Sequence, residues 1–142
     1  MKAFLNTKPA MVVHRRILKR DKVVYLLVGP KPHKYEHRRS RILYIGTTKR
    51  GAGRIAASAA YRAEDILEKR GIRSMEVYMV SCTAVPGFKS WLFLERALLA
   101  GFKLRYSELP FCNEQGKKLR WDDSLEKRIR LRAINRILDA FE

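Results

Sequence analysis

The sequence predicts an α/β fold in which a small, mainly antiparallel three-stranded sheet is flanked by helices and followed by a C-terminal amphipathic helix. Two apolar runs rich in β-branched residues, 21–29 and 41–47, each end at a glycine-containing turn. A third segment, 74–82, has the alternation of a strand, and segments with helical spacing of apolar residues follow the second and third runs. The length of 142 residues suits one domain with a core, so we expect a single domain over 1–142.

The first two strands are expected to pair. The connection between them, "PKPHKYEHRRS", contains two prolines and six Lys, Arg or His residues, and it is longer than an ordinary hairpin loop. We interpret it as a long exposed basic loop, which is either functional or a solvated segment that maintains solubility. In the N-terminal extension 1–21, residues 11–18 fit a short strand or one helical turn equally well.

Three helices are expected. The first spans about 52–69, with apolar residues at i, i+4 and i+8 and Gly71 as a stop signal. The second runs from about 90 to 103 after Pro86-Gly87. The last spans about 123–141, where Asp123 followed by Glu126 marks a capped start and arginines surround an apolar stripe.

Charge and composition narrow the classes of function. The chain has 31 Lys and Arg against 14 Asp and Glu, a net charge of +17, which favours a polyanion such as nucleic acid. No apolar run is long enough to span a membrane, and the N-terminus lacks the apolar core of a signal peptide, so we expect a cytoplasmic protein without a membrane partner. Cys82 and Cys112 stand alone, and His33 and His37 fall in the basic loop, so a zinc site is not expected.

Two residues have placements that need a reason. On the second helix Glu95 shares a stripe with Trp91 and Leu98, so its carboxylate faces the core and is paired either with an arginine or with a metal ion. Arg54 lies near a helix start, where the dipole favours anions, so it is either a phosphate ligand or ordinary surface charge. Tyr25 and Tyr44, taken alone, read as core residues of strands.

In order along the chain, "VVY" at 23–25, "YIG" at 44–46, Arg54, Glu95 and Asn113 in "PFCNEQG" resemble the GIY-YIG nuclease family. The resemblance covers about residues 22–117, and only YIG is intact as a short motif.

The resemblance implies an endonuclease, a hydrolase that cuts the phosphodiester bonds of DNA, or of RNA as the alternative, with one Mg²⁺ or Mn²⁺. It implies that Glu95 binds the metal and that Arg54 holds the scissile phosphate. Tyr25 and Tyr44 would orient or deprotonate the attacking water, and either is a candidate base; Asn113 would brace the site. One such site cuts one strand, so a double-strand break would need a homodimer or two visits.

The chain departs from the family pattern at several positions. The first motif lacks its usual glycine, and the tyrosines are more widely spaced because of the basic loop. Ser58 replaces the histidine or tyrosine one turn after the arginine, and Tyr61 on the same face is a candidate substitute. Thr47 replaces a common lysine, for which Lys49 and Arg50 are candidate substitutes. We expect the loop to bind the DNA backbone through its cations: Lys31, Lys34, Arg38, Arg39 and Arg41.

The departures at Ser58 and Thr47 keep two alternatives open. One is a nucleic-acid-binding module on the same fold with little or no activity. The other is a basic structural or ribosome-associated protein in which Glu95 and Arg54 pair in the core.

Overall fold

The computed structural model describes residues 22–68, 72–114 and 119–142. The elements in chain order are β1 (Val23–Lys34), β2 (Arg39–Thr48), α1 (Ala52–Ala63), a π-helical turn η1 (Glu64–Glu68), β3 (Glu76–Val80), α2 (Ser90–Tyr106), α3 (Asp123–Glu126) and α4 (Leu131–Asp139). The strands form a three-stranded sheet in the order β2-β1-β3, and both strand pairs are antiparallel. The predicted fold class is therefore confirmed. The undecided segment 11–18 lies outside the described residues.

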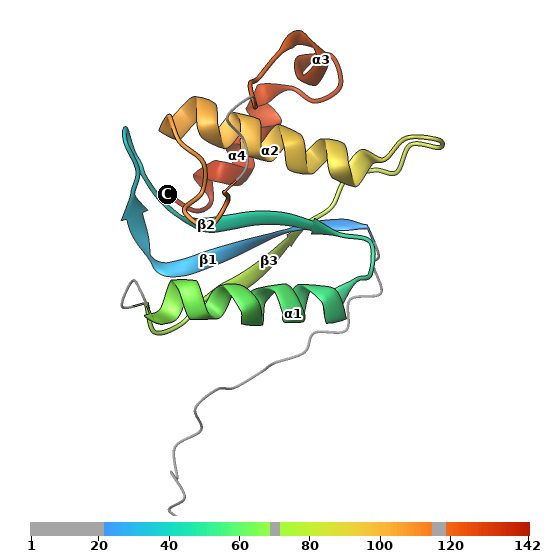
Figure 1. The fold of residues 1–142 in the computed structure, drawn as a ribbon. Coiled ribbons are helices and arrows are strands. Elements are labelled where there is room, and N and C mark those ends of the chain that lie inside the picture. Colours follow the sequence, from blue (N-terminus) through green and yellow to red (C-terminus); the bar gives the residue numbers. More distant parts are fainter. Residues whose placement is uncertain (1–21, 69–71, 115–118) are drawn as a thin grey trace, which may run out of the picture.

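Both faces of the sheet are covered by helices. In Figure 1, α1 lies along one face, and α2 and α4 lie on the other. The central strand β1 is buried from Val23 to Val28, because alternate side chains point into different cores. Val24, Leu26 and Val28 join the core under α2 and α4. Val23, Tyr25 and Leu27 join the core under α1, so Tyr25 reaches the helix that carries Arg54.

The expected long basic loop is instead an extension of the β1–β2 hairpin. The strands continue into it, with His33 paired to Ser40 and Lys34 to Arg39, and register shifts separate this extension from the main ladder. Tyr35 in the turn is buried, and its hydroxyl donates to the Ile42 carbonyl at 2.6 Å. This aromatic anchor explains why a proline-containing basic segment adopts an ordered hairpin.

The single C-terminal helix that was expected over 123–141 is wrong, because two helices, α3 and α4, occupy this segment. The Asp122 side chain caps α3 by accepting from the Leu125 N–H at 3.0 Å. The Glu126 carboxylate accepts from the Leu131 N–H at 3.2 Å and so supplies an acceptor to the start of α4. Between the helices, like charges at Lys127, Arg128 and Arg130 disfavour one continuous helix.

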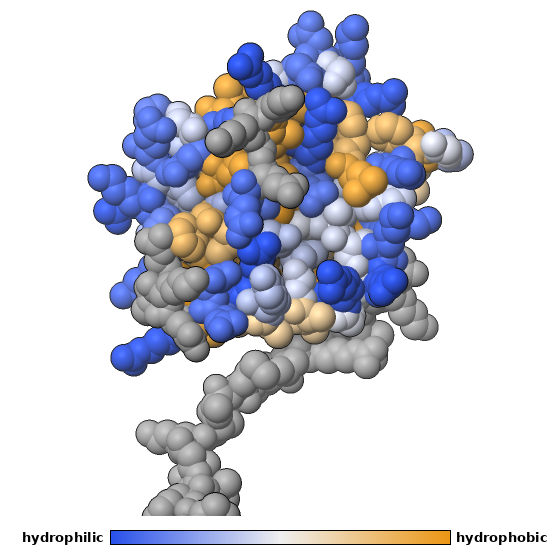
Figure 2. All heavy atoms as spheres, in the orientation of Figure 1, coloured by the Kyte–Doolittle hydropathy of each residue, from blue (hydrophilic) through white to orange (hydrophobic). Residues whose placement is uncertain are grey.

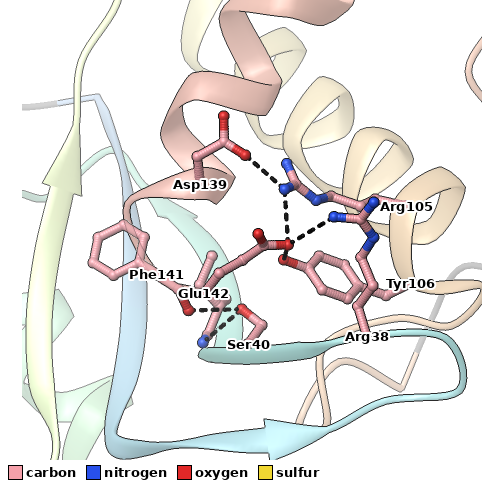
Figure 3. Close-up of polar contacts among 8 residues, drawn as sticks. Arg38, Ser40, Arg105, Tyr106, Asp139, Phe141 and Glu142 are labelled. Atoms are coloured by element: carbon pink, nitrogen blue, oxygen red, sulfur yellow. Dashed lines mark hydrogen bonds and ion pairs between the residues drawn. The ribbon is translucent and has the colours of Figure 1, made fainter.

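The C-terminal end of the chain packs against the hairpin through polar contacts (Figure 3). Arg105 of α2 pairs with Asp139 at 2.6 Å and with Glu142 at 2.7 Å. The Phe141 carbonyl accepts from the Arg41 N–H at 2.6 Å, and Glu142 also pairs with Arg38 at 3.4 Å. These contacts fix the base of the hairpin relative to α2 and α4.

None of the helices in the described ranges combines the length and the apolar character needed to cross a bilayer. In Figure 2, hydrophilic side chains surround the visible face, and apolar side chains gather in the upper half of the view, where α2 and α4 lie. Leu92 and Leu104 of α2 are among the exposed apolar residues.

Candidate functional site

Two tyrosines and a serine meet on the α1 side of the sheet. The Tyr25 hydroxyl on β1 donates to Oγ of Ser58 on α1 at 2.7 Å. The ring centroids of Tyr25 and of Tyr44 on β2 are 5.9 Å apart. Tyr25 is buried, whereas Tyr44 is partly exposed. Three elements thus bring together side chains that lie far apart in the sequence.

Gly46, the glycine of the YIG motif, lies beneath both tyrosines. It pairs with Tyr25 in the β1–β2 register. A Cβ at this position would lie 2.9 Å from each tyrosine hydroxyl and 2.5 Å from Cε1 of Tyr44. The glycine is therefore required by the close approach of the two rings, and both hydroxyls converge above its backbone.

We expect Gly46→Ala to displace the Tyr44 ring and to destabilise the protein by about 1–3 kcal/mol through overpacking. Urea unfolding measures this loss. Gly53→Ala is the matched control, since no atom lies within 4 Å of a Cβ at this α1 position. It should stabilise α1 by about 0.5–1 kcal/mol, because alanine favours helix. Equal effects of the two substitutions would contradict the close approach of the two tyrosine rings to Gly46.

The environment of Tyr25 keeps its hydroxyl protonated at neutral pH. Burial raises the pKa of Tyr25 to about 12, and the neighbouring Tyr44 adds to the rise. The bond to Ser58 and the positive charge of Arg54 act in the opposite direction. Tyr25 is therefore a hydrogen-bond donor in this structure, and the Arg54 guanidinium lies close enough for its charge to act on the Tyr25 hydroxyl.

Arg54 is exposed in the first turn of α1, as expected, and it forms no ion pair with the described residues. Sequence reasoning missed a second arginine, Arg62, whose guanidinium lies 5.0 Å from the centre of the Tyr44 ring. Arg62 also pairs with Glu114 at 3.8 Å. Arg54, Ser58 and Arg62 are spaced by four residues, which places them on one helix face. This spacing was the signal in the sequence that could have identified Arg62. Tyr61, the residue proposed from the sequence, is 70% exposed.

Asn113 braces β2 directly beside Tyr44. Its Oδ1 accepts from the Ile45 N–H at 2.9 Å, and its Nδ2 donates to the Ile45 carbonyl at 2.8 Å. The neighbouring Cys112 N–H donates to the Leu43 carbonyl at 2.9 Å. Because β2 is an edge strand, these two residues take the place of a further strand along it. Asn113 therefore holds the backbone of β2 at Ile45, and its part in a catalytic site stays a prediction.

We expect Asn113→Ala to lower the free energy of unfolding by about 1–3 kcal/mol, because it leaves both polar groups of Ile45 without these partners. Urea denaturation monitored by circular dichroism measures the loss. Asn135→Ala, on α4, removes the same atoms from a partly exposed position and serves as the control. An Asn113 variant as stable as the control would show that the two hydrogen bonds to Ile45 contribute nothing to the free energy of unfolding.

Glu95 lies on α2, and therefore across the sheet from α1 (Figure 1). Of its predicted stripe, Leu98 and Phe102 are buried, but Trp91 and Glu95 are only partly buried, at the margin of the contact. Burial raises the pKa of the Glu95 carboxyl to about 7. Of the two alternatives for Glu95, the ion pair with an arginine does not form within the described part of the chain, where its side chain has neither a salt bridge nor a hydrogen bond.

The predicted cations divide into two groups at opposite ends of the sheet. Lys49 and Arg50 are exposed in the turn before α1, at the end where both α1 and α2 begin. The hairpin residues lie at the other end (Figure 1). Arg38 pairs with Glu142 at 3.4 Å and Arg41 with Glu76 at 3.0 Å. The remaining hairpin cations are exposed: Lys31, Lys34 and Arg39.

Thr47 has a structural role, since its hydroxyl donates to the Val23 carbonyl at 3.0 Å. In the described ranges, no three or more His, Cys, Asp or Glu side chains converge into a metal-binding group.

Comparison with known proteins adds no relative: no protein-family model, no curated protein and no solved structure matches the chain at a significant level.

Proposed function

We propose that this protein is a divalent-metal-dependent endonuclease that hydrolyses phosphodiester bonds of DNA. The observation that carries the proposal is the convergence of Tyr25 and Tyr44 above Gly46, next to Arg54, which has no ion pair among the described residues. Such a cluster of hydroxyl donors and a guanidinium suits a phosphate and an attacking water. The net charge of +17 supports a polyanionic substrate.

Each side chain has a role in the proposed hydrolysis. Arg54 binds two oxygens of the scissile phosphate and offsets the charge that develops in the transition state. Tyr25 donates its hydrogen bond to Ser58, so the partly exposed Tyr44 hydroxyl is the one available to orient the water. The water oxygen forms a bond to phosphorus and releases a proton to solvent, the bond to the leaving sugar oxygen breaks, and that oxygen takes up a proton from solvent. Asn113 holds Ile45, and with it the neighbouring Tyr44, in place.

Glu95 suits a hard cation. Mg²⁺ keeps several waters and binds proteins through one or two carboxylates, and Glu95 is a partly buried carboxylate without a charged partner among the described residues. The bound ion would supply Lewis-acid stabilisation of the phosphoryl oxygens. Arg54 and Glu95 are both in the first two turns of helices that begin at the same end of the sheet (Figure 1). We propose that the nucleic-acid backbone crosses this end.

Nicking of supercoiled plasmid tests the proposal. The protein is incubated with Mg²⁺, with Mn²⁺ or with EDTA, and the relaxed product is quantified on a gel. We expect relaxation with either ion and none with EDTA. Salt-dependent binding without relaxation of any DNA form would contradict the proposal and would favour a binding module on this fold.

The exposed cations of the β1–β2 hairpin allow a test of DNA binding that does not involve the residues proposed for hydrolysis. Neutralising Lys31, Lys34 and Arg39 together should reduce the slope of log Kd against log salt by up to about 3, if each contacts one phosphate. Arg38→Ala is the control for a cation already paired with Glu142, and we expect little change in slope from it. Fluorescence anisotropy over a salt series measures both. An unchanged slope in the triple variant would exclude Lys31, Lys34 and Arg39 as phosphate contacts.

A further inference from the structure

The segment between β3 and α2 projects beyond the end of the sheet where α1 and α2 begin (Figure 1). Its tip is held as a tight turn by a bridge between Val85 and Phe88, in which the Phe88 N–H donates to the Val85 carbonyl at 3.1 Å. Together with the start of β1 it forms a groove of about 810 Å³. The proposed phosphodiesterase chemistry leaves this groove without a role.

The groove combines cations with aromatic and apolar side chains. Lys22 and Lys89 line it, and no Asp or Glu is among its lining residues. Trp91 and Phe88 supply rings, and Val85 is 51% exposed. The guanidinium of Arg128 lies 4.5 Å from the Phe88 ring and adds a third positive charge beside the groove. This combination suits a strand that presents both phosphates and unpaired bases.

The position of Trp91 is not explained by internal hydrogen bonding. Its indole N–H is buried and has no acceptor among the described residues, which costs free energy. The ring instead has the Lys22 ammonium 5.3 Å from its centre. A base stacked on the ring would replace this contact, and Lys22 would then bind a phosphate.

The groove and the proposed site share two elements, β1 and α2. Val23 lines it, and Tyr25 follows two positions later on the same side of β1. Trp91 lies one helical turn before Glu95 on α2, so the two side chains are neighbours on the helix surface. A strand lying in the groove would therefore run toward the residues assigned to hydrolysis.

We propose that this groove binds an unpaired DNA strand adjacent to the scissile phosphate, so that the substrate is single-stranded or branched DNA. This inference rests on the proposed function for its substrate class. In an intact duplex the base faces are stacked on each other and cannot contact Trp91 or Phe88, whereas a single strand exposes them. The lysines then bind the phosphates of the same strand.

Binding is measured in EDTA, so that the outcome does not depend on cleavage. Fluorescence anisotropy compares a labelled oligothymidylate with a labelled blunt duplex for the full chain. We expect tighter binding of the single strand, and we expect Trp91→Ala to weaken it by about tenfold with little effect on the duplex. Equal affinity for both probes in the wild type, or an unchanged Kd in the variant, would overturn the proposal.

A second variant guards against misfolding of Trp91→Ala. Thr83→Glu places a negative charge on an exposed lining residue and should weaken single-strand binding. Ser74→Glu adds the same charge at an exposed position just before the start of β3, whereas the groove follows the end of this strand. It should not weaken single-strand binding specifically. If Thr83→Glu weakens duplex and single strand equally, the groove binds phosphates generally and the proposal fails.

Tryptophan fluorescence gives an independent readout. The sequence contains two tryptophans, and Trp121 bonds to Glu126 on α3, away from the groove lining. In Trp121→Phe, oligothymidylate should quench the emission of Trp91, since stacked bases quench indole. Absence of quenching would overturn the stacking assignment. Quenching without plasmid relaxation in Mg²⁺ would support the groove and contradict only the nuclease proposal.

Discussion

Glu95→Gln is expected to abolish metal-dependent nicking while stabilising the fold above neutral pH. The amide has nearly the shape of the carboxylate, but it cannot supply the anionic oxygen that binds Mg²⁺. Because a metal contributes several kcal/mol to transition-state stabilisation, cleavage should fall by about a thousandfold. Binding of DNA in EDTA should persist, since Arg54 and the surface cations are unchanged.

The stability effect follows from the raised pKa of Glu95. Burial raises this pKa from the ordinary 4.5 to about 7, so between these values the folded protein binds more protons at this residue than the unfolded chain does. The free energy of unfolding therefore falls as pH rises from about 4.5 to 7, and the loss is complete above the folded-state value. Glutamine has no such penalty, so the variant should be more stable than the wild type at pH 8 and equally stable at pH 4; the gain is smaller than the full shift in pKa implies, because the carboxyl is only partly buried and solvent screens it.

Urea denaturation of both proteins at a series of pH values measures this difference. Glu64→Gln, at an exposed position of η1, is the matched control and should change neither nicking nor the pH profile of stability. Mg²⁺ should raise the midpoint of the wild type at pH 8 and leave Glu95→Gln unchanged. A variant that still nicks plasmid at the wild-type rate would exclude Glu95 as the metal ligand.

The strands could be predicted from sequence because their signals are local, whereas a shared site of Tyr25 and Tyr44 was expected only from the resemblance, since each tyrosine taken alone is typical of a strand core. β-branched runs ending at glycine located β1 and β2, and the YIG motif marked the glycine on which the two rings converge. The amide of Asn113 bonds to Ile45 across 68 positions. Its place near the site was expected only from the resemblance, since no local pattern specifies so distant a contact.

Other features depend on tertiary contacts that a single sequence does not reveal. The hairpin extension is ordered by the buried Tyr35 and by the hydrogen bond from the Arg41 N–H to the Phe141 carbonyl, and neither contact has a sequence signature. The break between α3 and α4 requires the Glu126 carboxylate to reach the Leu131 N–H. The four-residue spacing of Arg54, Ser58 and Arg62 already indicated that Arg62 lies on the same helix face. The residue proposed from the sequence was instead the tyrosine one position earlier, which the structure shows to be exposed.

We expect Arg54→Ala to lower the rate of nicking by about 10²–10³-fold, the loss typical of removing one donor to a developing charge. The side chain is exposed and pairs with no acid in the described part of the chain, so the free energy of unfolding should change by less than about 0.5 kcal/mol. Single-turnover nicking at saturating protein separates this loss of rate from any loss of affinity. Arg73→Ala removes the same charge from an exposed position before β3 and is the control.

Arg54→Lys distinguishes a bidentate phosphate ligand from a general positive charge. Lysine keeps the charge that opposes the rise in the pKa of Tyr25, but it lacks the planar fork that binds two oxygens at once. If Arg54 acts through its fork, the lysine variant should remain much slower than the wild type. Recovery of the full rate with lysine would mean that Arg54 acts only through its field on the tyrosines, and the phosphate contact would have to come from Lys49, Arg50 or Arg62 instead.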